Sequence, residues 1–190
     1  MALPDSFLAV VGTPLVFADH AGDFAPTAAN SLEHGTPTDV QLSLASVANN
    51  AARQSAKADL GANRAEAYAA YAAFEFAATP TAGNVVELWW NPSHSTTAGT
   101  ANVGGCSGSD AAYSGYSSNL DASIKQLQYI GDFVCTAQAT ATVQVVRVGV
   151  LYPEHRHGSL VVYNRSGAAF HSDDVECHVV LDPLLPQIQD

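Results

Sequence analysis

The stretch DVQLSLASV, residues 39–47, alternates apolar and polar side chains, with Val40, Leu42 and Leu44 on one side of the chain. A period of two is typical of a half-buried β-strand. The stretch RQSAKADLG, residues 53–61, alternates in the same way. These neighbouring segments predict a fold that is built from strands.

The remainder of the chain carries further strand signals, which are apolar runs bounded by turn residues. We expect strands at residues 85–90, 124–135, 141–151, 158–164 and 176–184. About eight strands with regular turn signals, and no convincing helix, indicate an all-β protein. The arrangement that fits them best is an antiparallel, jelly-roll-like sandwich.

One segment, residues 65–78, is ambiguous between helix and strand. Tyr68, Tyr71 and Phe74 recur at a spacing of three, and the many alanines favour a helix. The FEF motif that follows alternates, and the turn TPTAGN leads directly into VVELWW at 85–90. We therefore expect a bulged strand that forms a hairpin with residues 85–90 and buries its aromatic side chains.

Two parts of the chain differ from this strand pattern. Residues 1–38 contain four prolines and no sustained period, which predicts an extended N-terminal arm with one short strand, at 7–11 or 15–18. Such an arm covers its own sheet edge or reaches a neighbouring subunit. The β-domain then spans 39–190 and contains a long loop at 91–121, rich in glycine, serine and threonine.

Composition excludes several classes of partner. The 190 residues carry a net charge of −11 and only seven lysines and arginines, so we expect binding neither to nucleic acid nor to anionic membranes. The N-terminus lacks the basic region of a signal peptide, which predicts synthesis in the cytoplasm without export. Only 13% of the residues are charged. Such a weakly charged surface suits assembly with other subunits, and a GC-rich coding sequence, which yields many alanines, would produce it equally well. The three cysteines, Cys106, Cys135 and Cys177, do not form a disulfide framework or a zinc-finger spacing.

The stretch GGCSGSD, residues 104–110, matches a cysteine version of the nucleophile elbow, with Cys106 or Ser107 as the nucleophile. An elbow needs a buried strand before it and a helix after it. The preceding TTAGTANV has too few apolar residues, and the following AAYSGYSSN disfavours a helix. We interpret the stretch as a flexible loop and expect no catalytic residue, so the protein is predicted not to be an enzyme.

Metal ligands are also weakly indicated. His155 and His157 fit the start of the first cupin motif, but that motif places a glutamate where this chain has Val161 or Val162. We therefore expect two solvent-facing turn histidines and neither a metal nor another cofactor. The acidic segment HSDDVECH, residues 171–178, has carboxylates that could bind Ca²⁺, but we interpret it as a solvated loop that enters the last strand.

Exposed aromatic side chains are the remaining candidates for a binding site. Trp89 and Trp90 must point to opposite faces of a strand, so one belongs to the core and the other can be exposed. Tyr113 and Tyr116 lie in the long loop that follows. An exposed tryptophan with these tyrosines would suit a sugar-binding platform or a protein contact. The alternative is that these rings are buried under the loop.

Several stretches together resemble a group of tailed-bacteriophage structural proteins. They are VVGTPLVFAD, QSAKADLG, FAATPTAGNVVELWW, SGSDAAYS, LQYIGDFV, GSLVVYNRSGAAFHS and HVVLDPL, in this order, and they cover most of the chain. The resemblance implies a virion component without enzymatic activity.

Within that group, the features fit a capsid decoration (cement) protein. Its expected partners are the major capsid protein or other virion proteins, and it would act as a homo-oligomer, with a trimer favoured. Three alternatives remain: a tail or baseplate protein, a carbohydrate- or receptor-binding module, and a cupin-like metalloprotein.

Overall fold

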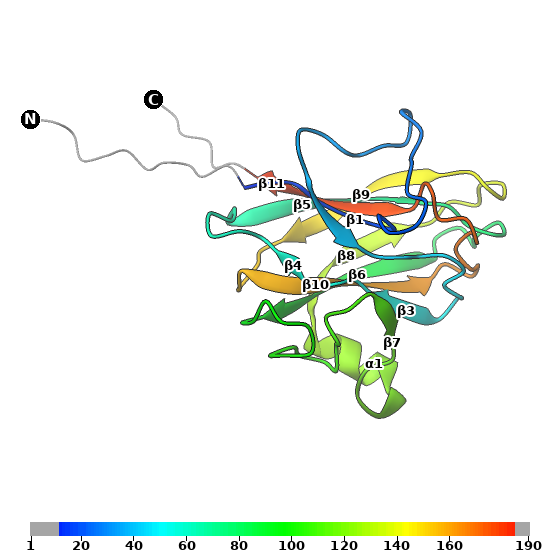
Figure 1. Ribbon diagram of the computed structural model, residues 1–190. Coiled ribbons are helices and arrows are strands. Elements are labelled where there is room, and N and C mark those ends of the chain that lie inside the picture. The colour runs from blue at the N-terminus through cyan, green and yellow to red at the C-terminus, as the bar shows by residue number, and fades with distance from the viewer. Residues whose placement is uncertain (1–11, 185–190) are drawn as a thin grey trace, which may run out of the picture.

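The computed structural model describes residues 12–184, and most of its regular structure is β-strand, which confirms the all-β class (Figure 1). The strands are β1 (Leu15–Ala18), β2 (Thr38–Gln41), β3 (Ala51–Gln54), β4 (Ala58–Asp59), β5 (Ala67–Phe74), β6 (Val85–Ser93), β7 (Ala111–Tyr113), β8 (Gln128–Val134), β9 (Gln144–Leu151), β10 (His157–Arg165) and β11 (His178–Leu184). The helical turns are η1 (Tyr116–Ser118), α1 (Leu120–Ser123) and η2 (Ile124–Gln126). In the described range, none of the helices has the length and apolar character that crossing a membrane requires.

The strands form one curled sheet in the order β2-β1-β11-β5-β9-β8-β6-β10-β3-β7, with β4 paired to β10. The pairing is antiparallel except between β1 and β2, so the sheet is mixed. We call β2, β1, β11, β5 and β9 the β5 half, and β8, β6, β10, β3 and β7 the β6 half. Figure 1 shows the two halves as facing layers, with α1 beyond the β6 half.

The two halves meet where β8 pairs with β9, at the pair formed by Gly131 and Gly149. A Cβ atom on Gly149 would overlap the carbonyl oxygen of Ile130, and one on Gly131 would overlap that of Val148. Glycine is needed at both positions because the backbones approach each other so closely. Side chains packed in the core also hold the two halves together.

The core lies between the halves and is rich in aromatic rings. Phe74 of β5 packs against Phe133 of β8, with 4.8 Å between ring centroids, and against Phe170, at 5.0 Å. Phe17 of β1 meets Trp90 of β6 edge to face at 6.4 Å. All five side chains are fully buried, so these contacts across the core join the β5 half to the β6 half.

The alternating segments that predicted strands form shorter strands than expected. Residues 39–47 contribute β2 and then a loop, and residues 53–61 contribute the end of β3 and β4. Val40, Leu42 and Leu44 are nevertheless all buried, as their alternation predicted. Burial is retained without a regular strand because Leu44 is anchored through its backbone, whose N–H donates to a buried carboxylate.

The bulged strand expected at residues 65–78 is confirmed as β5, with a register shift between Ala70 and Tyr71. The hairpin with residues 85–90 was wrong. β5 pairs with β11 and β9, whereas β6 pairs with β10 and β8 in the other half. Both faces of β5 are almost entirely buried, so this strand needs a central place that a two-stranded hairpin cannot provide.

The described part of the predicted N-terminal arm packs on its own sheet. Of the two placements for its strand, 15–18 is found as β1, between β11 and β2, and 7–11 lies outside the described residues. Phe24 and Leu32, in the loop after β1, cover the outer face of β1 and β11. The boundary expected at residue 38 falls at the first residue of the paired strand β2.

The expectation for the long loop at 91–121 was wrong at both ends. β6 continues to Ser93, β7 lies within the loop, and helical turns replace the first residues of the strand that was expected from residue 124. The Asn119 side chain accepts a hydrogen bond from the backbone N–H of Ala122 at 3.2 Å, which caps α1. Ile124, in the turn after α1, packs in a second apolar cluster on the outer face of the β6 half.

Candidate functional site

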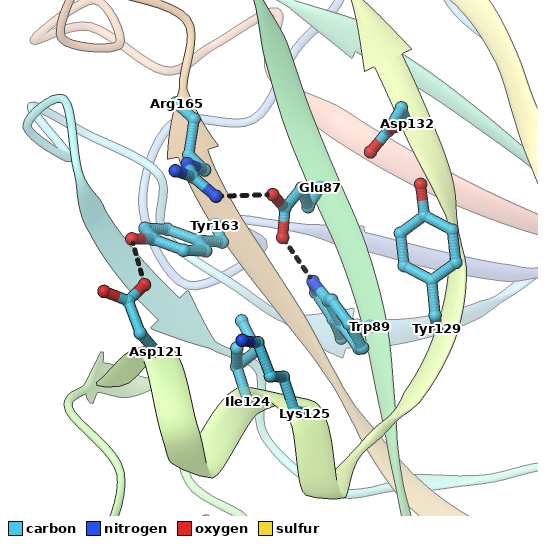
Figure 2. Close-up of a pocket in the computed structure, with 9 residues that line it drawn as sticks. All are labelled: Glu87, Trp89, Asp121, Ile124, Lys125, Tyr129, Asp132, Tyr163 and Arg165. Atoms are coloured by element: carbon cyan, nitrogen blue, oxygen red, sulfur yellow. Dashed lines mark hydrogen bonds and ion pairs between the residues drawn. The ribbon is translucent and has the colours of Figure 1, made fainter. Parts of the chain in front are cut away.

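A hollow of about 420 Å³ lies on the outer face of the β6 half, beside the helical turns (Figure 2). Its lining residues come from β6, β8 and β10 and from the turns that follow β7. They are Glu87, Trp89, Asp121, Ile124, Lys125, Tyr129, Asp132, Tyr163 and Arg165.

The strand register explains how these side chains come together. Trp89 of β6 pairs with Tyr129 of β8, and Glu87 of β6 pairs with Asp132 of β8 and with Tyr163 of β10. Directly opposed residues of antiparallel strands have neighbouring side chains on the same face. The three strands therefore place two aromatic rings in one row of the sheet and a phenol and two carboxylates in the next.

A β-bulge makes this arrangement possible. The pairing between β6 and β8 shifts register between Leu88 and Trp89. In a regular strand, two residues three positions apart point to opposite faces. Because of the bulge, Tyr129 and Asp132 both line the outer hollow, while Ile130 and Phe133 point into the core.

The carboxylate of Glu87 is held in place by two donors. The indole N–H of Trp89 donates to its Oε2 at 3.0 Å, and the guanidinium of Arg165 donates to its Oε1 at 3.2 Å. The guanidinium carbon of Arg165 also lies 5.3 Å from the centroid of the Tyr163 ring. The side chain of Glu87 is only 15% exposed, so its direction is fixed.

The wall opposite β8 comes from the helical turns. The Tyr163 hydroxyl donates to Asp121 Oδ1 at 3.0 Å, which ties α1 to β10. Burial, and then the hydrogen bond to Asp121, raise the pKa of Tyr163. Burial, and then Asp132, raise the pKa of Tyr129. Both phenols therefore stay protonated at neutral pH and can donate hydrogen bonds.

The open side of the hollow is aromatic. The rings of Trp89 and Tyr129 lie 4.8 Å apart between centroids and are inclined by 59°. Tyr129 is 47% exposed, and Trp89 is partly exposed. Together they present an apolar surface next to fixed polar groups.

Of the four aromatic residues that the sequence indicated, one lines this hollow. Trp89 and Trp90 do point to opposite faces, and Trp90 is fully buried in the core. Tyr113 is buried too, and its hydroxyl donates to the carbonyl of Gly104 at 2.6 Å. Tyr116 is 55% exposed but is not part of the hollow.

Other residues of the hollow were not predicted from the sequence, among them Glu87, Tyr129, Tyr163 and Arg165. Glu87 could have been found, because residues two positions apart on a strand point to the same face and Glu87 precedes Trp89 by two. Tyr129 could not be found in this way, because a period of two does not reveal the bulge that turns it outward.

The segment 104–110 lacks the geometry of a nucleophile elbow, because it leads into β7 and not into a helix. Burial raises the pKa of the Cys106 thiol to about 12, so the thiol is protonated at neutral pH. The loop is also more ordered than expected. The backbone N–H of Ser107 donates to Gln54 Oε1 at 2.7 Å, and the Lys57 backbone N–H donates to the Gly108 carbonyl at 3.0 Å.

The two candidate metal ligands, His155 and His157, do not converge on one point. The ring of His155 lies against that of His94, with 3.7 Å between centroids. His157 begins β10 and its side chain is only 12% exposed, so the expectation of a solvent-facing turn histidine was wrong there. Its Nε2 lies 3.6 Å from Asp59 Oδ1. A metal ion would need both imidazole rings to point at it, whereas His155 contacts His94 and His157 contacts Asp59.

Carboxylates converge at a different place. Within residues 12–184, only Asp19, Asp23 and Asp174 bring three potential ligand atoms within 4.8 Å of one another. Asp174 is buried, contrary to the expectation of a solvated loop. Its Oδ2 already accepts hydrogen bonds from the backbone N–H groups of Leu44, at 2.6 Å, and Ala45, at 3.0 Å. Asp174 thus holds the loop after β2 against the segment before β11.

The chain matches no protein family model, no curated protein and no solved structure. Among the features described above, the hollow beside Trp89 is the one that combines an open apolar surface with oriented polar groups. Such a combination is typical of a site that binds a polar small molecule.

Proposed function

We propose that this chain is a non-enzymatic structural protein of a phage virion, specifically a capsid decoration (cement) protein that stabilises the shell through oligomeric contacts. The observation that carries the proposal is the order in which the strands pair. The stretches that resemble tailed-phage structural proteins support the same conclusion.

The strand order fits a jelly roll. Eight strands form the pattern: β1, β3, β5, β6, β8, β9, β10 and β11. Numbered one to eight along the chain, they pair as 1-8-3-6 in the β5 half and as 2-7-4-5 in the β6 half. This order matches the pairing expected when two Greek keys are wound together, which is an architecture of viral capsid and lectin domains, and it therefore supports the proposal.

The short edge strands and two exposed valines suit repeated contacts between subunits. β2 and β7 lie at the two ends of the sheet and have only four and three residues, so they limit uncontrolled edge-to-edge pairing. Val134 and Val145, which flank the loop between β8 and β9, are exposed apolar side chains. Symmetric oligomers, of which a trimer is our favoured form, would cover such positions and add up many modest contacts.

The test is the copy number of this protein in purified virions, measured by quantitative mass spectrometry against the major capsid protein. A copy number comparable with that of the capsid protein supports decoration of the shell. A much smaller number, set by the symmetry of the tail, supports the alternative of a tail or baseplate protein. Absence from the particles would refute both.

A second measurement separates decoration from simple incorporation. The purified chain is examined by light scattering for its oligomeric state and is then added to capsids that lack it. We expect an oligomer that binds these capsids at saturable sites and raises the temperature at which they release their contents. A monomer that does not bind would contradict the proposal.

A further inference from the structure

We propose that the hollow beside Trp89 is a binding site for a neutral saccharide of one or two pyranose rings. This inference does not rest on the virion assignment, because it concerns the isolated chain. Three features of the hollow fit such a ligand: its aromatic surface, its fixed hydrogen-bonding groups and its charge.

The aromatic surface would receive the face of the sugar. A pyranose ring carries its C–H groups on its faces and its hydroxyls around its rim, so one face can pack on an aromatic ring while the rim stays polar. Trp89 and Tyr129 together offer such a surface, and the 47% exposure of Tyr129 leaves room for a ligand. Tyr and Trp suit this role because they combine an apolar body with a polar group.

The polar groups around the rings would receive the hydroxyls. Each oxygen of Glu87 accepts one hydrogen bond within the protein, from Trp89 or from Arg165, and a carboxylate oxygen can accept another. Arg165 is half exposed and keeps further N–H donors. Asp132 lines the same hollow and forms no ion pair with any residue in the range 12–184. Figure 2 shows Glu87 between Arg165 and Trp89, and Asp132 beyond Tyr129.

Charge and size restrict the ligand further. The lining has three carboxylates, on Glu87, Asp121 and Asp132, against two cations, on Lys125 and Arg165, and the whole chain has a net charge of −11. Acidic sugars and phosphates would meet an excess of negative charge, whereas neutral hydroxyls donate well to carboxylates. The volume of about 420 Å³ lies within the usual range of small-molecule sites, roughly 300–1,000 Å³.

The two tryptophans allow a direct test. In ¹⁵N-labelled protein, Trp89 and Trp90 give two indole N–H signals, which a Trp89→Phe variant assigns. The probes are glucose, galactose, mannose, N-acetylglucosamine and disaccharides of each. We expect at least one probe to shift the Trp89 signal saturably and to leave that of the buried Trp90 unchanged. If no probe shifts the Trp89 signal at millimolar concentrations, the proposal is wrong.

Substitutions then show whether binding uses the hollow. Tyr129→Ala and Glu87→Gln should each weaken binding of the active probe by about tenfold or more, as expected for central contact residues. Tyr152→Ala is the matched control, because Tyr152 is 64% exposed and lies outside the hollow, and it should bind like the unmodified chain. Tyr129 is preferred over Trp89 because its exposed ring contributes less to folding.

Two results would overturn the proposal even if a sugar binds. Unchanged affinity in a folded Tyr129→Ala variant would place the sugar elsewhere on the chain. Glucuronate binding as tightly as glucose would contradict the argument from charge. The two proposals fail separately. If the chain is absent from virions but still binds a sugar at this hollow, only the proposed function is refuted.

Discussion

Phe74→Ala tests whether the two halves of the sheet share one core. The Phe74 side chain is fully buried and contacts Phe133 at 4.8 Å and Phe170 at 5.0 Å. β5 is held by β9 on one side and β11 on the other, so it cannot move in to fill the space. We therefore expect a loss of about 4 kcal/mol in the free energy of unfolding, within the range for such substitutions.

The assay is equilibrium unfolding in urea, followed by tryptophan fluorescence and by circular dichroism. With a urea m-value of about 2 kcal/mol/M, a loss of about 4 kcal/mol lowers the midpoint by about 2 M. Tyr152→Ala, at an exposed site, should change stability by less than about 0.5 kcal/mol. A cost below about 1.5 kcal/mol for Phe74→Ala, or separate transitions with the two probes, would refute the shared core.

Three further predictions concern single groups. All three cysteines are buried, and burial raises the pKa of Cys106 to about 12, so a thiol reagent should label none of them in the folded protein and all of them in urea. Rapid labelling of Cys106 would contradict this. Burial lowers the pKa of His178, whose Nε2 accepts a hydrogen bond from the N–H of Leu32 at 3.1 Å. Because the unfolded chain then binds a proton more readily than the folded one, the free energy of unfolding should fall as the pH drops below about 6.5. His178→Gln should flatten this decrease between pH 7.5 and 5.5, and equal slopes would exclude His178 as its cause. Gly149→Ala should lower the free energy of unfolding by about 1–3 kcal/mol in chemical denaturation, because the new Cβ overlaps the carbonyl of Ile130. A neutral effect would mean that β8 and β9 do not pair so closely there.

Much of the local structure could be predicted from the sequence. Alternation placed most strands within a few residues of their observed positions, and it put Trp89 and Trp90 on opposite faces. The bulged strand β5 was found despite its many alanines, because the aromatic residues and the following turn outweighed helix propensity. The helical turns at 116–126 were not predicted, because each is only three or four residues long.

The candidate site was predicted only in part. Trp89 was named from the sequence, but Tyr129 was hidden by a bulge and Arg165 lies far away in the chain. His155 and His157 are close in sequence, yet their rings contact different partners, so proximity in the chain did not make a ligand pair.

By itself, the sequence indicated most of the strand segments, though not all of their bounds, and which side chains in them are apolar, because the period of two is a local property of the backbone. The tertiary structure decided which strands pair, since β5 and β6 are neighbours in the chain and lie in different halves of the sheet. It also decided that Glu87, Tyr129 and Tyr163 share one hollow, because that depends on the register of three strands and on one bulge. Pairing and register are set by contacts between residues distant in the chain, and a local pattern carries no information about them.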